Sequence, residues 1–309
     1  QVSYRAFYGC SSLTSVALPE SIVEIGRYAF EGCSSLKTIA LPSSVTIIGG
    51  SAFSSCTSLT AIAIPDGVRN ISESVFKGCS ALTSVVLPES VTEIGQYAFE
   101  GCSALTAIDL PDKLVEIGAY AFRDCASLTT VTWPSSLARI GSQAFAACAK
   151  LPAAALGASV TTVGDGAFRG CTSLLSFDVA EDNSSFEVRS GYLCRKTDSA
   201  VLAAPGTLTE LRIPDGVTTI APSAFAGLPG LRKVYIPNSV TTIGSSAFEG
   251  CINIADVTSS GRWAMKTLFP YNVYTKVITN VTVLAGCERL ADSFCQDCAK
   301  LQKVTLPDS

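Results

Sequence analysis

Cysteine is the side chain in this sequence with the widest chemical capacity, because its thiolate can attack an electrophile, bind a metal ion or form a disulfide. The chain has thirteen cysteines among 309 residues. Eight of them follow one another at an interval of 23 residues: Cys10, Cys33, Cys56, Cys79, Cys102, Cys125, Cys148 and Cys171. Because each stands once per interval in a Gly-Cys-Ser or similar turn, we predict a buried column of free thiols that pack as small apolar groups. Metal binding or disulfide formation by the column is the alternative, and only Cys295 and Cys298, outside it, have Cys-x-x-Cys spacing.

Other catalytic arrangements are missing from the sequence. The chain contains no histidine, which excludes a Ser-His-Asp triad and removes the commonest general base and metal ligand. No glycine-rich phosphate loop follows a strand-like segment. Glutamates recur at one position, as Glu24, Glu93 and Glu116, but we expect them on a regular outer wall rather than in a cleft. We therefore predict a protein with no enzymatic activity, no metal site and no cofactor.

The cysteine interval is part of a repeat that covers whole segments. A fixed period of this length is typical of a stacked repeat array. In the coil 82–105, a short β-branched segment ends at Pro88 and predicts a strand, whose stacked copies form a parallel sheet with strands about 4.8 Å apart. The segment 91–95 predicts a second extended stretch on the opposite wall, with Gly95 at a corner where a side chain would obstruct the turn. The segment 97–102 predicts a single helical or 3₁₀ turn.

The pattern Leu-x-x-Val-x-Leu-Pro-x-x-Val-x-x-Ile-Gly-x-x-Ala-Phe-x-x-Cys resembles the BspA-like, treponemal-type leucine-rich repeats. The phenylalanines that obey it are Phe7, Phe30, Phe53, Phe76, Phe99, Phe122, Phe145, Phe168, Phe225, Phe248 and Phe294. This resemblance covers nearly the whole chain. It implies a right-handed leucine-rich-repeat solenoid of the α/β horseshoe class, with about 13 coils of 23 residues made mostly of short parallel β-strands and 3₁₀ or helical turns. Characterised members of the family mediate adhesion to extracellular matrix proteins, host cells or other microbes, so the resemblance also implies a secreted or cell-surface location.

We expect a single solenoid over residues 1–309, with two interruptions. Regular repeats occupy 1–176, and the interval between Phe168 and Phe225 is then more than twice the regular one. Within the irregular coil 177–208, two apolar runs flank a polar segment at 196–199 and predict a β-hairpin. Regular repeats at 209–255 are followed by an aromatic insert at 256–274 and by terminal repeats at 275–309. Because the chain begins and ends partway through a repeat, we expect the array to continue beyond it.

The outward positions of the first strand change in character along the chain. They are small in the N-terminal coils, as at Thr129, Thr130 and Thr132, and become charged or aromatic towards the C-terminus. Protein interfaces favour Trp, Tyr and Arg. The candidate protein-binding residues are therefore Arg212, Arg232, Lys233, Tyr235, Arg262, Trp263, Phe269 and Tyr271. A solvated charged face, and aromatic packing that fills the gap left by a missing coil, are the alternatives.

Charge and hydropathy exclude two classes of partner. The net charge of −4 argues against nucleic acid, which requires a basic surface. No run of 18 apolar residues is present, so we expect no membrane span in this chain. Three Asn-x-Ser/Thr sequons, at Asn70, Asn183 and Asn280, are N-glycosylation candidates in a eukaryotic secretory protein and chance matches in a bacterium.

Two functions remain after these exclusions. The first is an extracellular array that binds a protein of the matrix, the host or a neighbouring cell surface. The second is a structural segment of a cell-surface filament that assembles by head-to-tail stacking. The filament hypothesis rests on a phase match, since placing the last four residues before Gln1 nearly rebuilds an internal repeat, two residues short.

Overall fold

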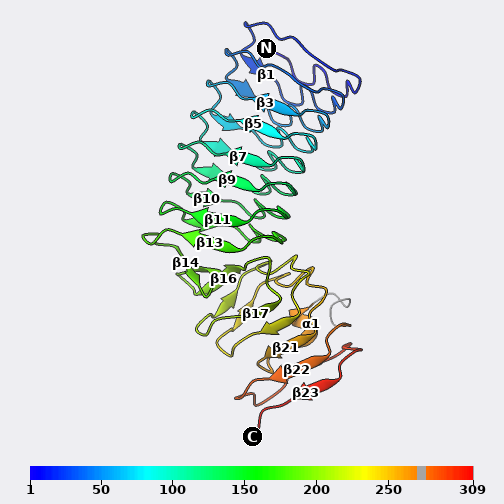
Figure 1. The fold of residues 1–309 in the computed structure, drawn as a ribbon, viewed down its shortest axis with the longest axis vertical. Coiled ribbons are helices and arrows are strands. Elements are labelled where there is room, and N and C mark those ends of the chain that lie inside the picture. The colour runs from blue at the N-terminus through cyan, green and yellow to red at the C-terminus, as the bar shows by residue number, and fades with distance from the viewer. Residues whose placement is uncertain (270–275, 309) are drawn as a thin grey trace. The chain divides into compact units, whose positions relative to one another are not determined.

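The computed structural model describes residues 1–269 and 276–308 and divides the chain into two compact units. The first unit comprises residues 1–174 and 178–184, and the second comprises residues 175–177 and 185–309. Short strands recur along the chain and form a β-solenoid of about 12 turns of about 23 residues, with little helix (Figure 1). The predicted leucine-rich-repeat solenoid is thus confirmed.

The first unit has one wall made from the predicted first strand of each coil. Strands β3 and β5 pair in parallel, as do β7 and β9, and each residue lies opposite its copy in the next coil. Figure 1 shows these strands stacked one after another along the unit. In each strand the middle residue points inward and its two neighbours are exposed, apart from the half-buried centre of β9. The strands of this wall are β3 (Ala61–Ala63), β5 (Ser84–Val86), β7 (Ala107–Asp109), β9 (Thr130–Thr132) and β11 (Ala153–Leu156), and β13 (Ser176–Val179) follows at the boundary between the units.

The predicted second extended stretch forms the opposite wall. Five of its strands make one parallel sheet in the order β12-β10-β8-β6-β4, and β1 pairs with β2. Each strand has only two residues because a glycine or another small residue follows the buried isoleucine or valine. The strands are β1 (Glu24–Ile25), β2 (Ile47–Ile48), β4 (Asn70–Ile71), β6 (Glu93–Ile94), β8 (Glu116–Ile117), β10 (Arg139–Ile140) and β12 (Thr162–Val163).

Gly95 is required for close packing between coils. A Cβ atom on Gly95 would lie 2.9 Å from the backbone nitrogen of Glu73 and 2.9 Å from the carbonyl oxygen of Ile71. The obstacle is therefore the backbone of the preceding coil, because any side chain here would push two coils apart.

The segment 97–102 forms consecutive β-turns instead of the predicted helical or 3₁₀ turn. Tyr97 and Gly101 have φ values of 59° and 74°, which lie in the left-handed region and end any right-handed helical run. The N–H groups of Tyr97, Phe99 and Gly101 donate to carbonyl oxygens of the next coil at 2.7 to 3.0 Å. This edge of the solenoid, which we name the turn ridge, is thus a third line of hydrogen bonds between coils.

The core of the first unit is a continuous column of identical side chains. Phe7, Phe30, Phe53, Phe76, Phe99, Phe122, Phe145 and Phe168 stack with ring centroids 5.0 to 5.9 Å apart. The Phe30 to Phe145 rings are fully buried. Burial of each ring stabilises the fold by about 1.5–3 kcal/mol, so the column holds successive coils in register.

The second unit contains two five-stranded sheets. The first has the order β14-β15-β16-β18-β20, and its β15 and β16 are antiparallel strands joined through 196–199, where the sequence predicts a hairpin. Strand β14 adds a second hairpin that the sequence did not predict. The strands are β14 (Phe186–Arg189), β15 (Tyr192–Arg195), β16 (Ala200–Ala203), β18 (Thr219–Ile220) and β20 (Thr242–Ile243).

The second sheet of this unit is parallel and has the order β17-β19-β21-β22-β23. Its strands are β17 (Glu210–Arg212), β19 (Lys233–Tyr235), β21 (Asp256–Ser259), β22 (Asn280–Val283) and β23 (Lys303–Thr305). The first residues of the expected aromatic insert thus belong to a regular strand, because Val257 takes the buried place between Val234 and Val281. The irregular stretch begins after Ser259 and contains the short helix α1 (Met265–Leu268).

Candidate functional site

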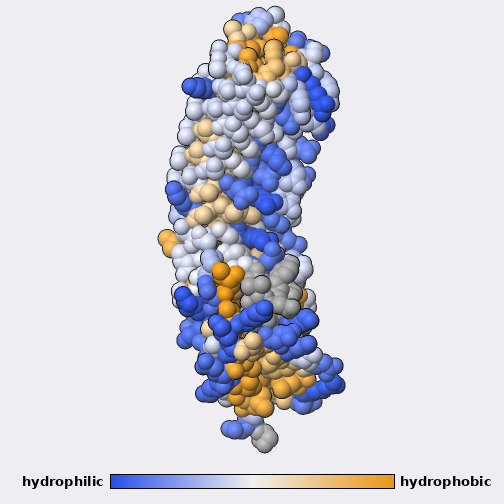
Figure 2. Space-filling model, turned by 90° about the vertical axis from the view of Figure 1, so that its right-hand side faces the viewer, coloured by the Kyte–Doolittle hydropathy of each residue, from blue (hydrophilic) through white to orange (hydrophobic). Residues whose placement is uncertain are grey.

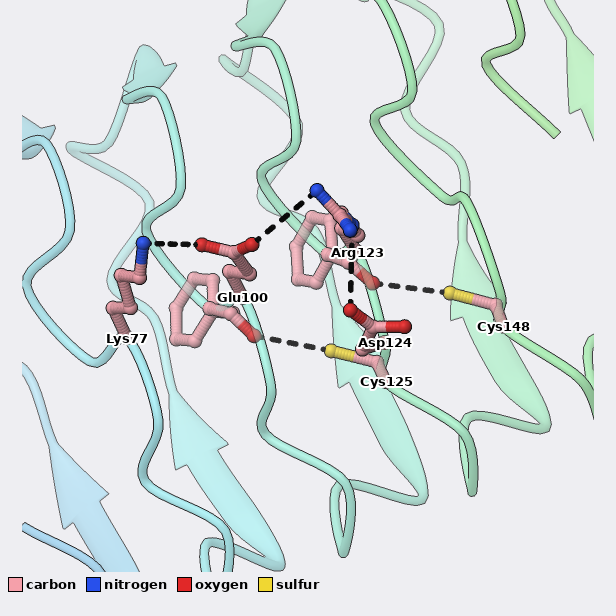
Figure 3. Close-up of polar contacts among 8 residues, drawn as sticks. Lys77, Glu100, Arg123, Asp124, Cys125 and Cys148 are labelled. Atoms are coloured by element: carbon pink, nitrogen blue, oxygen red, sulfur yellow. Dashed lines mark hydrogen bonds and ion pairs between the residues drawn. The ribbon is translucent and has the colours of Figure 1, made fainter. Parts of the chain in front are cut away.

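The cysteine column lies inside the first unit and its thiols are hydrogen-bonded. The thiol of Cys125 donates to the carbonyl oxygen of Phe99 at 3.2 Å, and that of Cys148 to the carbonyl oxygen of Phe122 at 3.2 Å (Figure 3). The same bond, always to a phenylalanine 26 residues earlier, is made at 3.1 to 3.2 Å by Cys33, Cys56, Cys79, Cys102 and Cys171. All seven are buried free thiols, so the prediction is confirmed for them. It is wrong for Cys10, which is exposed because no earlier coil of the described residues covers it.

Burial also makes these seven thiols poor nucleophiles. It raises the pKa of Cys33 to about 11 and that of Cys171 to about 12, because a thiolate loses its hydration inside the solenoid. The pKa values of the thiols between them are raised for the same reason. Since the thiolate is the reactive form, the column has a structural role.

The Cys-x-x-Cys pair near the C-terminus has no group of further metal ligands around it among the described residues. Within residues 1–269 and 276–308, no group of three or more Cys, Asp or Glu side chains is arranged to hold a metal ion. Cys298 is buried and Cys295 is partly exposed, and both are free thiols. Burial raises the pKa of Cys298 to about 11.

The repeated glutamates lie on the outer wall, as predicted. Glu93 is exposed on β6, and Glu116 on β8 forms an ion pair with Arg139 of the next coil. Such pairs between neighbouring coils fix register and stabilise the fold by about 0.2–1 kcal/mol each. Glu93 lies opposite Glu116 on the neighbouring strand, and the Glu116 carboxylate is engaged by Arg139.

The outward face of the sheet β17-β19-β21-β22-β23 brings together four of the candidate binding residues. The guanidinium of Arg212 lies 4.2 Å from the ring centroid of Tyr235, which is its direct neighbour on β19. Arg232 and Lys233 are exposed beside them. We name Arg212, Arg232, Lys233 and Tyr235 the strand-face cluster.

Charges alternate along this face. One outward row runs Glu210, Lys233, Asp256, Asn280 and Lys303, each opposite the next. Opposite charges on neighbouring strands attract, and Asn280 donates a hydrogen bond to Asp256. The other outward row begins with Arg212 and Tyr235 and continues with threonines. Because its cation faces an aromatic ring rather than a carboxylate, the start of that row has the more accessible positive charge.

A hollow of about 520 Å³ adjoins this cluster. It is lined by Arg189, Tyr192, Arg212 and Asp215, together with Ser190, Ile213 and Pro214. The Tyr192 hydroxyl accepts a hydrogen bond from the Arg212 backbone N–H at 3.1 Å and so fixes the hairpin against β17. Sequence reasoning missed Arg189 and Tyr192, since the second hairpin that positions them has no polar turn signal beyond Ser190-Gly191.

The remaining candidate residues do not join the strand-face cluster. Arg262 is exposed and lines a separate hollow of about 280 Å³ with Asn238 and Cys287. Trp263 is half-buried, and its Nε1 has no hydrogen-bond partner in the described part of the chain. Phe269 is only 1% exposed and packs against Phe248 at 5.3 Å between centroids, so it belongs to the core. Tyr271 lies outside the described residues.

The three sequons have different environments. Asn70 is exposed on β4, and Asn280 is half-buried on β22. Asn183 is 1% exposed, and its side-chain amide donates to the carbonyl oxygens of Gly157 at 2.7 Å and Val160 at 3.0 Å. Asn183 is therefore corrected from a glycan candidate to a buried structural residue, because a glycosylated amide could not occupy this position.

Surface hydropathy differs between parts of the molecule. On the face that Figure 2 shows, strongly hydrophilic and strongly hydrophobic side chains lie next to one another in the C-terminal part of the chain. Exposed apolar side chains of the second unit include Ile252, Val304 and Leu306. Among the described residues, no helix has the length and apolar character needed to cross a membrane.

Comparisons with known proteins identify the repeat. The BspA type leucine rich repeat region matches residues 1–104, 69–198 and 198–309, in 6 copies. A search of curated proteins gave no significant match. A leucine rich cell surface protein of Faecalibacterium prausnitzii is 25% identical with a TM-score of 0.65, over 99% of this chain and 83% of that one. The pneumococcal vaccine antigen PcpA is 20% identical with a TM-score of 0.58, over 95% and 82% of the two chains, and shares the fold. With its repeat matched from end to end, the chain belongs to the BspA-type leucine-rich repeat family.

Proposed function

We propose that this chain is a non-catalytic array that binds a protein partner outside the cell or at a cell surface. Leucine-rich-repeat solenoids of this family are generally non-catalytic. The observation that carries the proposal is the contact between the exposed Arg212 and the half-buried Tyr235 on the outward face of a regular parallel sheet. A cation held on an aromatic ring by neighbouring strands is already ordered, so binding loses little side-chain entropy.

The strand face of the second unit is better suited to binding than that of the first. In the first unit the outward strand positions are small, as at Ala61, Ala63, Ser84 and Thr130. Residues of this kind are under-represented among those that dominate binding energy, whereas Arg and Tyr are enriched. The strand-face cluster is therefore the proposed contact region.

Binding to a panel of immobilised extracellular matrix proteins and to intact host cells tests the proposal. The variant Arg212→Ala, Arg232→Ala, Tyr235→Ala is expected to bind at least about 10-fold more weakly than the unchanged chain. The matched control Ser84→Ala, Thr130→Ala, Thr132→Ala changes the corresponding face of the first unit and is expected to bind normally. Equal binding by both triple variants contradicts the assigned region, and no binding to any matrix protein or cell contradicts the function.

A second candidate function is end-to-end self-association into a filament. It is favoured by the regular parallel pairing of neighbouring coils, because head-to-tail stacking of copies would repeat the same strand register. Sedimentation and electron microscopy at high protein concentration test it, and a strictly monomeric particle contradicts it.

A further inference from the structure

One turn of the second unit contains two cysteines where the repeat has a phenylalanine and a cysteine. In a regular coil the N–H of Cys251 donates to the carbonyl oxygen of Phe248 at 3.1 Å and closes the turn. In the last described coil the N–H of Cys298 donates to the carbonyl oxygen of Cys295 at 3.3 Å. Cys298 thus continues the thiol position of the repeat, and Cys295 takes the position of the phenylalanine.

The backbone before the two cysteines confirms this alignment of the last coil with the repeat. Ser246 and Ser293 begin the two turns with φ values of 55° and 57°, in the left-handed region. The N–H of Glu249 donates to the carbonyl oxygen of Ser246 at 3.0 Å, and the N–H of Gln296 donates to that of Ser293 at 2.9 Å. The turn is therefore the ordinary turn of the repeat, in which Phe294 holds the place of an alanine.

The two thiols of this turn lie next to each other. A side-chain hydrogen bond joins Cys295 and Cys298. The Cα atoms of the first and last residues of a β-turn are less than about 7 Å apart, and a disulfide requires about 4.4–6.8 Å. This proximity is set within a single turn, so it does not depend on what covers the coil. The backbone of the reduced protein therefore already provides the separation that a disulfide requires.

Neighbouring thiols of the first unit are arranged differently. Cys79 and Cys102 belong to successive coils, and each donates to a backbone oxygen of the coil before its own. The acceptors are the carbonyl oxygens of Phe53 at 3.1 Å and Phe76 at 3.2 Å. A disulfide between these two thiols would break both hydrogen bonds inside the core, and the lost bonds oppose its formation.

We infer that Cys295 and Cys298 form a reversible disulfide by exchange with a low-molecular-weight disulfide, such as glutathione disulfide. The thiolate of one cysteine attacks a sulfur of glutathione disulfide, forms a mixed disulfide and releases one glutathione. The thiolate of the other cysteine then attacks the protein sulfur of the mixed disulfide and releases the second glutathione. Two protein thiols are thus oxidised to one disulfide, and glutathione disulfide is reduced to two thiols that carry the two protons.

Folding favours this disulfide because the repeat fixes the turn before any sulfur–sulfur bond forms. Asp297 has a φ of 63°, and Gly250 at the same place of a regular coil has a φ of 80°. The unfolded segment has no such constraint and must lose backbone freedom to bring its thiols together. By linkage, the factor by which folding favours the disulfide is also the factor by which the disulfide stabilises the folded chain.

The experiment equilibrates the native chain, and a synthetic peptide of residues 290–300, with one series of glutathione buffers, starting from reduced and from oxidised samples. Free thiols are then blocked with N-ethylmaleimide in denaturant, and the tryptic peptide 290–300 is measured by mass spectrometry. This peptide contains Cys295 and Cys298 and no other cysteine, so the disulfide lowers its mass by ~2 Da and prevents labelling. The equilibrium constant for oxidation is expected to be at least about 10-fold larger in the chain than in the synthetic peptide, which corresponds to about 1.4 kcal/mol of added unfolding free energy in the oxidised chain.

Two controls separate the turn from general thiol oxidation. The tryptic peptide 78–113 contains Cys79 and Cys102 and is expected to carry two blocked thiols in every buffer. Cys295→Phe introduces the residue that the repeat has at this position, and its unfolding free energy is expected not to change with the glutathione buffer. An oxidation constant in the chain no larger than in the synthetic peptide, equal oxidation of 78–113, or a disulfide that joins Cys287 to either cysteine overturns the inference. The strand-face cluster is unchanged in Cys295→Phe, so the result is independent of the proposed function.

Discussion

The substitution Cys102→Ala tests the hydrogen-bonded thiol column. The Cys102 thiol is fully buried and lies 3.2 Å from the carbonyl oxygen of Phe76. Its removal loses one hydrogen bond, about 1 kcal/mol, and the burial of a group of roughly methylene size, about 0.8 kcal/mol before any cavity. The Phe76 carbonyl keeps its bond from the Cys79 N–H at 3.1 Å, so the penalty of an orphaned acceptor does not apply. We expect the free energy of unfolding to fall by about 2 kcal/mol.

Guanidinium unfolding at neutral pH, followed by circular dichroism, measures this loss. Cys10→Ala is the matched control, because Cys10 belongs to the same sequence column but is exposed. It is expected to change stability by less than about 0.5 kcal/mol. If Cys102→Ala costs no more than Cys10→Ala, the thiols do not hold the coils together and the reasoning is refuted.

Three further predictions concern the core. The contribution of the buried thiols to stability is expected to be constant from neutral pH to pH 9 and to fall as pH rises from 9 to 11. Unfolded thiols ionise near pH 9, whereas burial raises the pKa of Cys33 in the folded protein to about 11. In a titration of the free energy of unfolding, each such thiol lowers that free energy by about 1.4 kcal/mol per pH unit over this range. Gly95→Ala is expected to lower the free energy of unfolding by about 1–3 kcal/mol, because the added Cβ would lie 2.9 Å from backbone atoms of the preceding coil. Gly157→Ala is the control and is expected to change the melting temperature little, because its added Cβ would lie 3.7 Å from the nearest atom, the Cα of Ser135. A thiol reagent followed by mass spectrometry is expected to label Cys10 in the native protein and Cys125 only after unfolding, and native labelling of Cys125 would contradict its burial.

The repeat made the two walls predictable. Side chains one repeat apart were expected to stack, and they do so at Phe76 and Phe99, with centroids 5.3 Å apart. The same rule places Arg212 beside Tyr235, which is its counterpart in the next coil. Register in a solenoid is carried by sequence spacing alone, because each coil contacts only its neighbours.

Other features have no signal in the spacing of residue types. The hydrogen bonds of the buried thiols join residues 26 positions apart, as Cys102 and Phe76 are, and so do not follow the 23-residue repeat. They depend on how the turn of one coil places a phenylalanine carbonyl next to the thiol of the following coil. The left-handed backbone at Tyr97 is carried by a residue that does not favour it, so the β-turns of the ridge were unexpected. Phe269 and Asn183 were predicted as surface residues because sequence does not show what packs over an irregular segment.

Hydroxyl-radical footprinting of the chain bound to a matrix protein tests the central claim most directly, because it measures which side chains lose solvent access in the complex. Our account predicts that Tyr235 on the strand face is protected on binding, while Tyr97 and Tyr120 on the turn ridge of the first unit keep their reactivity. Unchanged reactivity of Tyr235 in a saturated complex would contradict the assignment of this face as the binding surface.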